Sequence, residues 1–465
     1  MENRFNALTS KEWLPFQKSW SVIDSDETLI RDNLRFFTMP SIEPRNVYYT
    51  GPRFAEFEAI ARSLGLEGSQ SAFPTVQFAL LDIRRDLMEC RSLGDFTAVR
   101  DKTLAKVSQV AMSLVDRRFV CVLAANIELN GALVPTAWGI GKALAQVLSL
   151  KDEKILCRDS NVSTGLSGST VEYALYARKD GAPPHRTESA WSIESFFSSS
   201  ANPGRSGEIP KWFVLKPPPR KKAEVLHPAK YPESLAEQFI SAFTKPGDSV
   251  LDPMSGTGST QLAAVSLGRN GFGTELSPFF AELANSRLSE FCNPVQGELL
   301  ELGQQCGSYR IVQADARQIQ HLGFPLCDYA CTSPPYWDML NMKGAENQVR
   351  RIEQGLQTNY SSDDNDLGNV ADYRHFIDEL SDIYLKMFRA MRPKSYFTFV
   401  VKNIKKQGAA YPFAWDLTHR LLRAATPVSE HFWLQDDLSI APYGYGNTWV
   451  SNTFHQYCIT MQLTD

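Results

Sequence analysis

The chain has 465 residues, of which 43% are hydrophobic and 22% charged, so it has the composition of a globular protein with two or three domains or one large one. Its net charge of −4 excludes a uniformly basic nucleic-acid-binding protein, and any nucleic-acid surface must therefore be local. No apolar run approaches the roughly 18 residues of a membrane span, and the first residues, Met-Glu-Asn-Arg, do not open a signal peptide. We therefore expect a cytoplasmic protein without a membrane segment.

The eight cysteines are scattered along the chain and include no Cys-x-x-Cys pair. This spacing predicts neither a zinc site nor a disulfide framework. Cysteines in apolar runs are expected to be buried free thiols.

The first part of the chain alternates between helical and strand patterns. Aromatic residues with helical spacing come first and are expected to pack on the core: Trp13, Phe16 and Trp20. Helical spacing recurs over residues 54–66 and 99–114, whereas residues 119–124 form a continuous apolar run typical of a strand that is covered on both faces. These patterns predict an α/β fold.

The chain also resembles itself at one fixed offset, the separation between Asn126 and Asn403, which we call the repeat offset. Between residues 126 and 144, eight of nineteen positions carry the same residue one repeat offset later: Asn126, Ile127, Gly131, Ala132, Pro135, Ala137, Trp138 and Leu144. Chance is the alternative, but Gly, Pro and Trp at one fixed offset are not a product of helical or strand periodicity. Residues 36–41 more weakly resemble residues 329–335. The first part of the chain is therefore interpreted as a degenerate copy of the last third.

Residues 157–225 have a different composition. This stretch is rich in Ser, Thr and Gly and ends in the polyproline piece 217–219 followed by Arg220, Lys221 and Lys222. It is predicted to be a linker or surface arm. Its three cations are expected to be a solvated patch, with contact to a phosphate backbone as the alternative.

A Gly-rich turn follows the linker. The apolar run 249–251 leads into Asp252-Pro253-Met254-Ser255-Gly256-Thr257-Gly258 and then into a helical pattern. A strand, a Gly-x-Gly turn and a helix form a nucleotide-type site, because the glycines let backbone N–H groups approach a ligand.

Two carboxylates extend this pattern. Glu275 ends the next strand-like run and is placed to accept both hydroxyls of a ribose, and Asp315 ends a third run and is placed to bind an adenine amine. No Gly-Lys-Ser/Thr follows the turn, so a triphosphate is not expected. The pattern predicts a ligand with an adenosine group and no polyphosphate.

The stretch Thr332-Ser333-Pro334-Pro335-Tyr336-Trp337 follows a short apolar run that is predicted to be a strand. The two prolines cannot donate ladder hydrogen bonds, so the strand must end there in a stiff loop. This loop offers a hydroxyl, a free carbonyl and two aromatic faces, a set suited to holding a flat ring with an exocyclic amine. A plain proline turn is the alternative.

Together these motifs resemble those of the S-adenosylmethionine-dependent DNA amino-methyltransferases, which methylate cytosine N4 or adenine N6. The resemblance covers residues 226–465 and rests on residues 227–235, the turn at 252–260, Glu275-x-x-Pro278, Asp315 and residues 332–337. It implies a Rossmann-like methyltransferase sheet with helices on both faces. The Ser-Pro-Pro-Tyr form of the loop is similar to that of the cytosine N4 enzymes.

The resemblance also implies roles for individual residues. The cofactor S-adenosylmethionine would be bound by His227, Pro228, Asp252, Ser255, Gly256, Gly258, Glu275 and Asp315. The catalytic loop would consist of Ser333, Pro334, Pro335 and Tyr336, with Ser333 and the Pro334 carbonyl accepting hydrogen bonds from the target amine. Tyr336 would stack on the base, and Trp337 would present a second aromatic face to it.

This chemistry needs neither a cysteine nucleophile nor a metal, because an exocyclic amine can attack the activated methyl group directly once it is positioned. The base must leave the duplex to reach the loop. The expected partner is therefore double-stranded DNA, and a restriction or defence partner is compatible with this function. An adenine N6 enzyme and an RNA or protein amine methyltransferase are the alternatives, and a non-catalytic DNA-binding relative is the least favoured one.

These inferences divide the chain into four segments. Residues 1–156 would be the degenerate copy, with a structural or DNA-contacting role, and residues 157–225 the linker. Residues 226–325 would form the cofactor-binding half and residues 326–465 the catalytic half.

A DNA-recognition segment is predicted within the catalytic half. Residues 341–371 are polar and contain three cations that would contact DNA: Lys343, Arg350 and Arg351. The acidic end of this segment, 363–366, is expected to face solvent.

Overall fold

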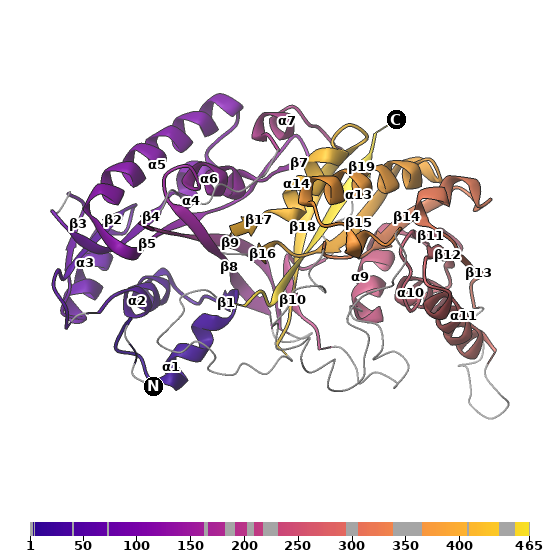
Figure 1. The fold of residues 1–465 in the computed structure, drawn as a ribbon, viewed down its shortest axis with the longest axis horizontal. Coiled ribbons are helices and arrows are strands. Elements are labelled where there is room, and N and C mark those ends of the chain that lie inside the picture. The colour runs from indigo at the N-terminus through magenta and orange to yellow at the C-terminus, as the bar shows by residue number, and fades with distance from the viewer. Residues whose placement is uncertain are drawn as a thin grey trace.

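A single fifteen-stranded mixed sheet runs through the whole molecule and carries helices on both faces (Figure 1). The computed structural model describes residues 3, 5–39, 41–71, 74–161, 166–181, 191–201, 209–216, 231–293, 306–337, 365–406, 409–436 and 452–464. The predicted α/β class is confirmed. Over these described ranges, no helix is long and apolar enough to cross a lipid bilayer.

The C-terminal unit, which we define as residues 212–463, contributes the strand order β13-β12-β11-β14-β15-β19-β18-β10. Its first five strands are parallel, and β19 is antiparallel to both of its neighbours. The strands are β10 Trp212–Val214, β11 Ser249–Asp252, β12 Asn270–Glu275, β13 Tyr309–Gln313, β14 Cys327–Thr332, β15 Met391–Val401, β18 Ala425–Leu434 and β19 His455–Leu463. The helices are α9 Glu233–Phe243, α10 Ser259–Ser266, α11 Pro278–Cys292, α13 Tyr373–Phe388 and α14 Phe413–Leu421.

This topology is the Rossmann-like, doubly wound arrangement that the sequence predicted. From β11 the chain crosses through α10 to β12 on one side, whereas from β14 it crosses through α13 to β15 on the other. The strand order therefore reverses between β11 and β14, and in such sheets ligands bind outside the carboxyl ends of the strands at this reversal.

The N-terminal unit, which we define as residues 20–178, repeats this order on a smaller scale as β3-β2-β4-β5-β9-β8, with β1 paired to β8. Its strands are β1 Trp20–Val22, β2 Asn46–Thr50, β3 Glu67–Ser69, β4 Val76–Asp82, β5 Leu114–Ala124, β8 Ser149–Asn161 and β9 Ser167–Arg178. Its helices are α2 Asp26–Phe37, α3 Phe54–Ser63, α4 Arg84–Met88, α5 Leu93–Ser113 and α6 Thr136–Leu144. Within the described residues, two short helices lie outside the units, α1 Ser10–Trp13 and α7 Ile193–Phe197.

The repeat offset found in the sequence reappears in the element boundaries. Strand β5 and helix α6 lie one repeat offset before β15 and α14, with identical lengths. The same holds for the small hairpins β6 Ile127–Leu129 with β7 Ala132–Val134, and β16 Ile404–Lys406 with β17 Ala409–Tyr411. Even a rare backbone conformation is shared, because Arg117 and Lys394 have φ values of 63° and 60°.

The likeness extends upstream to elements that the sequence comparison missed. Helix α3 is followed by Gly65 at φ 75°, and helix α10 is followed by Gly268 at φ 73°. The flanking residues Ser63-Leu64-Gly65 and Ser266-Leu267-Gly268 are identical. The N-terminal unit therefore contains counterparts of the cofactor-half elements β11, α10 and β12, and not of the catalytic half alone.

The prediction that residues 157–225 form a linker is wrong for much of this stretch. Strand β9 lies within it and pairs with both β5 and β8, and the side chains of Tyr173 and Leu175 are fully buried. Strand β10 joins the two units by pairing with β9 and β18. The first segment consequently extends past residue 156, and Ser/Gly-rich composition concealed a central strand.

The weak match of residues 36–41 to the catalytic loop is also wrong. Thr38 is the C-cap of α2, and its hydroxyl donates to Leu34 O, just as Thr244 caps α9 and donates to Ile240 O. The shared Phe-Thr-x-Pro pattern therefore belongs to a helix end. By strand register, the position of Ser333 is occupied in the N-terminal unit by Asp82, at the end of β4.

Two local predictions also fail. Trp20 lies in strand β1 and not on a helix with Trp13, because a 3-10 turn at Leu14–Gln17 ends the first helix. Cys292 and Cys306 form a disulfide, although the cysteine spacing predicted none. The other six cysteines are buried free thiols, as expected.

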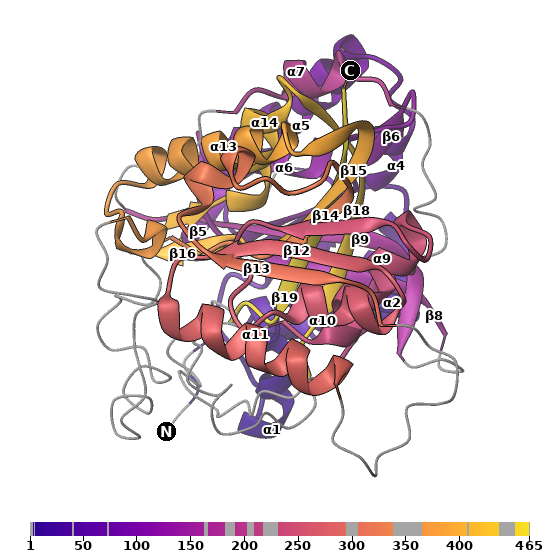
Figure 2. The same cartoon turned by 90° about the vertical axis from the view of Figure 1, so that its right-hand side faces the viewer.

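The helices divide the core into clusters on the two faces of the sheet. Helices α5, α6, α13 and α14 share one continuous hydrophobic cluster, which lies above the sheet in Figure 1. On the other face, α2 and α3 cover the N-terminal unit, and α9 and α10 cover the C-terminal unit with separate clusters. Figure 2 shows the C-terminal sheet between α13 above and α10 and α11 below.

At the end of β4, charged side chains fill the place that corresponds to the catalytic loop. Arg84, which is 8% exposed, donates two hydrogen bonds to the Asp82 carboxylate at 2.8 and 2.7 Å. Its remaining nitrogen lies 2.5 Å from Glu172 and 3.1 Å from Asp26. Arg158 pairs with the same two carboxylates. The N-terminal unit therefore holds a buried ionic network where the C-terminal unit holds Ser-Pro-Pro-Tyr.

Replacing Arg84 by Ala is expected to lower the free energy of unfolding by about 3 kcal/mol or more, because it leaves buried carboxylates without their cation. Arg85→Ala is the matched control in the same helix. The Arg85 side chain is 80% exposed and pairs with Glu89 across one helical turn, so a change within about 0.5 kcal/mol is expected. Urea unfolding of both variants measures the difference, and equal small losses would contradict the role of the network.

Candidate functional site

The predicted catalytic loop leaves the sheet at the reversal of strand order. Strand β14 ends at Thr332, next to β11, which ends at Asp252. The Thr332 hydroxyl donates to Asp252 Oδ1 at 2.6 Å, and the Thr260 hydroxyl donates to Oδ2 at 2.6 Å. Asp252 is 1% exposed. This carboxylate therefore connects the loop to the Gly-rich turn and to the first turn of α10.

Ser333 is fixed by the neighbouring strand. Its hydroxyl donates to Val400 O on β15 at 3.0 Å and lies 3.3 Å from the Tyr336 hydroxyl, which donates to Gln456 Oε1 at 2.6 Å. A serine hydroxyl has one hydrogen and two acceptor lone pairs. Because its hydrogen is used on Val400, Ser333 is left as an acceptor toward any group in front of it.

The two aromatic residues of the loop have different environments. Tyr336 is half-buried, and the Lys402 ammonium lies 5.5 Å from its ring centroid. Burial raises the pKa of the Tyr336 hydroxyl, which therefore stays protonated at neutral pH. Trp337 is 5% exposed and packs against Tyr373 and Tyr411, whose rings also contact each other. The structure thus shows a packing role for Trp337, and its contact with a substrate stays a prediction.

The Gly-rich turn bends over the start of α10. Gly256 and Gly258 have φ values of 52° and 78°, a region that side chains rarely adopt. A Cβ on Gly258 would lie 3.0 Å from Ala284 Cβ on α11. Glycine at this position therefore allows both the turn and the close packing of α11.

Glu275, at the end of β12, is held by backbone groups. Its two carboxylate oxygens accept hydrogen bonds from Gly256 N at 2.8 Å and from Ser277 N at 2.9 Å. Burial raises the pKa of Glu275 to about 7, although these two N–H groups favour the ionised form. The remaining lone pairs of the carboxylate can accept hydrogen bonds from hydroxyl groups of a ligand.

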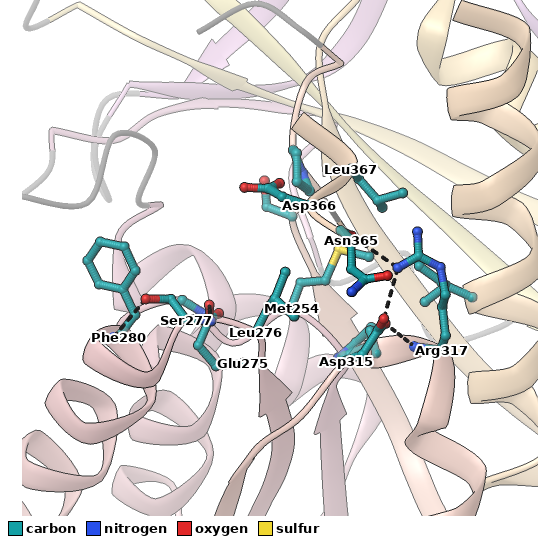
Figure 3. A pocket seen from close by; sticks show the side chains of 16 residues that line it. Met254, Glu275, Leu276, Ser277, Phe280, Asp315, Arg317, Asn365, Asp366 and Leu367 are labelled. Atoms are coloured by element: carbon teal, nitrogen blue, oxygen red, sulfur yellow. Dashed lines mark hydrogen bonds and ion pairs between the residues drawn. The ribbon is translucent and has the colours of Figure 1, made fainter. Parts of the chain in front are cut away.

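Asp315 follows β13 and begins a short 3-10 helix, Ala316–His321. Its carboxylate accepts from Arg317 N at 2.8 Å and from the Arg317 side chain at 2.9 Å, and Arg317 also binds Glu379 of α13 at 2.7 Å. Figure 3 shows Arg317 reaching across to Asp315 and to the Asn365 backbone. Asp315 is therefore partly neutralised by Arg317.

A pocket with about 720 Å³ of space between its atoms, part of it open to solvent, brings these elements together (Figure 3). Five of the predicted site residues line it: Gly256, Glu275, Asp315, Ser333 and Pro335. Apolar side chains that suit a flat ring also line it, among them Met254, Leu276, Phe280 and Ile383.

The other predicted site residues lie elsewhere. Asp252, Ser255 and Gly258 shape the turn without lining the pocket, and Ser255 is buried and accepts from Gln261 Nε2. Pro334, Tyr336 and Trp337 lie on the loop beside it. The remaining five fall outside the described residues: His227, Pro228, Lys343, Arg350 and Arg351.

Several lining residues were not predicted. Asp366 is 4% exposed, contrary to the expectation that the acidic end of the segment 341–371 faces solvent, and it caps the short 3-10 helix Leu367–Asn369 beside the pocket. Its Oδ1 accepts from Gly368 N at 2.8 Å. The sequence Asp366-Leu367-Gly368 is typical of an Asp side chain that caps a turn, and this pattern could have predicted the position of Asp366. Nothing in the sequence pointed to Phe280 or Ile383, which have the spacing of ordinary core residues.

Comparison with known proteins identifies part of this architecture. Residues 162–286 match the family model described as DNA methylase. The type II methyltransferase M.MthZI of Methanothermobacter thermautotrophicus is 34% identical over 122 residues, which are 26% of this chain and 34% of that protein. The type II methyltransferase M.HinfI of Haemophilus influenzae is 44% identical over 77 residues, 16% of this chain and 21% of that protein.

Among solved structures, TrmN from Thermus thermophilus aligns with 99% of this chain and 82% of its own, with 10% identity and a TM-score of 0.32, which is too low to support an argument. The family match runs from β9 through the Gly-rich turn to α11, and the chain spans about a third or less of the curated relatives that it matches. Through this segment the chain is similar to the DNA methylases of the matched family model and to these two type II methyltransferases.

Proposed function

We propose that the chain transfers a methyl group from S-adenosylmethionine to the exocyclic amine of a base flipped out of duplex DNA, with cytosine N4 as the favoured position. The observation that carries this proposal is the shared pocket. Ser333 and Pro335 of the loop line the same pocket as Gly256, Glu275 and Asp315. Acceptor groups for an amine therefore face a site with the features of an adenosine-binding crevice.

The residues of the pocket suit the cofactor. The Glu275 carboxylate has free lone pairs for the two ribose hydroxyls, and the apolar side chains of Leu276 and Phe280 offer surfaces for an adenine ring. Asp315 accepts from the adenine amine, with Arg317 fixing its orientation. When bound, the cofactor supplies an electrophilic methyl group next to the loop.

The loop positions the amine and needs no covalent intermediate. Ser333 donates its hydrogen to Val400 O, so its lone pairs accept from one N–H of the target amine, and the Pro334 carbonyl accepts from the other. Both hydrogen bonds raise the electron density on nitrogen and aim its lone pair at the methyl carbon. The cofactor would supply its methyl group to this nitrogen, with the C–S bond breaking as the N–C bond forms, and the proton lost by the methylated amine would pass to water.

Cytosine N4 is favoured over adenine N6 because Ser occupies the first loop position, which resembles the N4 enzymes. Tyr336 stacks on the flipped base, with Lys402 above the Tyr336 ring. The matched relatives are named type II methyltransferases, which supports a role in a restriction–modification system.

The test is nucleoside mass spectrometry of DNA methylated by the purified protein, with RNA and protein substrates in parallel. N4-methylcytosine is the expected product. N6-methyladenine would move the target to adenine, and methylation of RNA or protein alone would overturn the DNA assignment.

Ser333→Ala is expected to lower kcat by about 100-fold, because it removes one acceptor aimed at the reacting amine. The binding of S-adenosylmethionine, measured by calorimetry, should change little, which separates loss of chemistry from loss of folding. Methylation at the wild-type rate would show that the reaction does not depend on this loop, and would point to the N-terminal unit.

Cofactor affinity is expected to fall as the pH is lowered below about 7. The pKa of Glu275 is raised to about 7 in the free protein, and only the ionised carboxylate accepts from both ribose hydroxyls. Since binding favours the ionised form, the dissociation constant should rise up to about tenfold for each pH unit below this pKa. Titration calorimetry between pH 5.5 and 8.5 measures the slope, and Glu275→Gln should flatten it. A Gln variant with the original slope would assign the titration to another group.

A further inference from the structure

The two units contact each other through reciprocal buried carboxylates. Asn126, after β5 of the N-terminal unit, donates to Glu430 of the C-terminal unit at 3.0 and 2.9 Å. Asn403, after β15 of the C-terminal unit, donates to Glu153 of the N-terminal unit at 2.9 Å. The two glutamates are separated by the same repeat offset as the two asparagines. The units therefore meet as two copies of one interface.

Each asparagine also closes the hairpin that follows it. Asn403 Oδ1 accepts from Ala414 N at 3.1 Å, so its side chain joins the two ends of the β16–β17 hairpin. Asn126 Oδ1 accepts from Ala137 N at 3.0 Å across the β6–β7 hairpin. A carboxylate from one unit therefore fixes the base of a hairpin in the other.

The β16–β17 hairpin touches the catalytic loop. Lys406 Nζ lies 3.9 Å from the ring centroid of Trp337, and the Tyr411 ring lies 5.2 Å from it. Trp337 is the residue directly after Tyr336, so movement of this hairpin would move the end of the loop. The N-terminal unit holds the hairpin at a second point, where Asp152 pairs with Lys405.

Glu153 is deeply built into this contact. It is 5% exposed and accepts from Trp138 Nε1 at 2.7 Å and from Tyr457 hydroxyl at 2.8 Å, in addition to Asn403. Burial by itself would raise the pKa of Glu153, but His455, Tyr457 and Asn403 together hold it below its ordinary value. Trp138, Tyr457 and Asn403 thus all donate hydrogen bonds to the two oxygens of this ionised carboxylate.

We propose that the N-terminal unit positions the active site of the C-terminal unit, with Glu153 and Asp152 holding the β16–β17 hairpin against Trp337 and so fixing the catalytic loop. Glu153 is a positioning residue and touches no substrate. The mirror contact of Glu430 holds the β6–β7 hairpin of a unit in which Asp82 and Arg84 replace the loop, so it has no active site to position. The inference rests on the proposed methyl transfer.

The repeat supplies matched control variants. Glu153→Gln places an amide donor against Asn403, Trp138 or Tyr457, and is expected to lower kcat about tenfold or more with little change in the KM for S-adenosylmethionine. Glu430→Gln makes the equivalent change at the mirror site and should leave both constants of the folded protein near wild type. Asn403→Ala against Asn126→Ala repeats the comparison without altering charge, should either glutamine variant fail to fold.

Hydrogen–deuterium exchange gives a readout that does not depend on activity. Amides of residues 404–406 and 409–411 and of Ser333, Tyr336 and Trp337 should exchange faster in Glu153→Gln and Asn403→Ala than in their mirror variants. Equal kcat values within each matched pair, or unchanged exchange of these segments, would overturn the positioning role. An inactive wild-type protein would refute the proposed function, and the exchange measurement would still decide whether Glu153 fixes the loop.

Discussion

The buried carboxylate of Asp252 is the interaction on which the rest of the site depends. Its oxygens accept from Thr332 at the start of the catalytic loop and from Thr260 on α10, while Met254 N donates to it at 2.9 Å within the turn. Burial raises the pKa of Asp252, and these donors oppose that rise. A shift of the loop relative to the turn would leave buried polar groups unsatisfied, so the cofactor crevice and the catalytic loop keep one fixed relation.

The sequence was sufficient for the parts of the site that local chemistry determines. The turn at Gly256 and Gly258, the carboxylate of Glu275 and the proline-terminated strand before Ser333 all follow from backbone requirements of neighbouring residues. Motif spacing locates a side chain near a site without giving its contacts, so it did not predict that the Asp252 carboxylate accepts from Thr332 and Thr260. The packing of Trp337 against Tyr373 and Tyr411 was not predictable either, because these partners lie far along the chain.

The sequence revealed the repeat only where both copies still carry the same glycine, proline or tryptophan. Gly131, Pro135 and Trp138 kept the repeat offset visible, whereas the upstream elements share little beyond Ser63-Leu64-Gly65 and its counterpart at 266–268. Strand register reveals equivalent positions that residue identity does not. Trp20 pairs with Ile155, and Trp212 pairs in the same way with Phe432. The indole N–H of Trp20 donates to Gln435 O, and that of Trp212 donates to Arg158 O. Such contacts join residues that are more than fifty positions apart, so no local pattern could predict them.

The two units show how a repeated fold can differ at the loop and keep its interface. At the end of β4, Arg84 fills the place of the loop and neutralises Asp82, so the change is compensated within the N-terminal unit. Glu153 has no such local compensation, because two of its donors, Asn403 and Tyr457, belong to the other unit. Removing it would leave donors buried in the C-terminal unit without an acceptor, which costs more than a lost exposed contact. Interface residues of the N-terminal unit, such as Glu153, are therefore constrained by the C-terminal unit, which is the unit that has the Ser-Pro-Pro-Tyr loop.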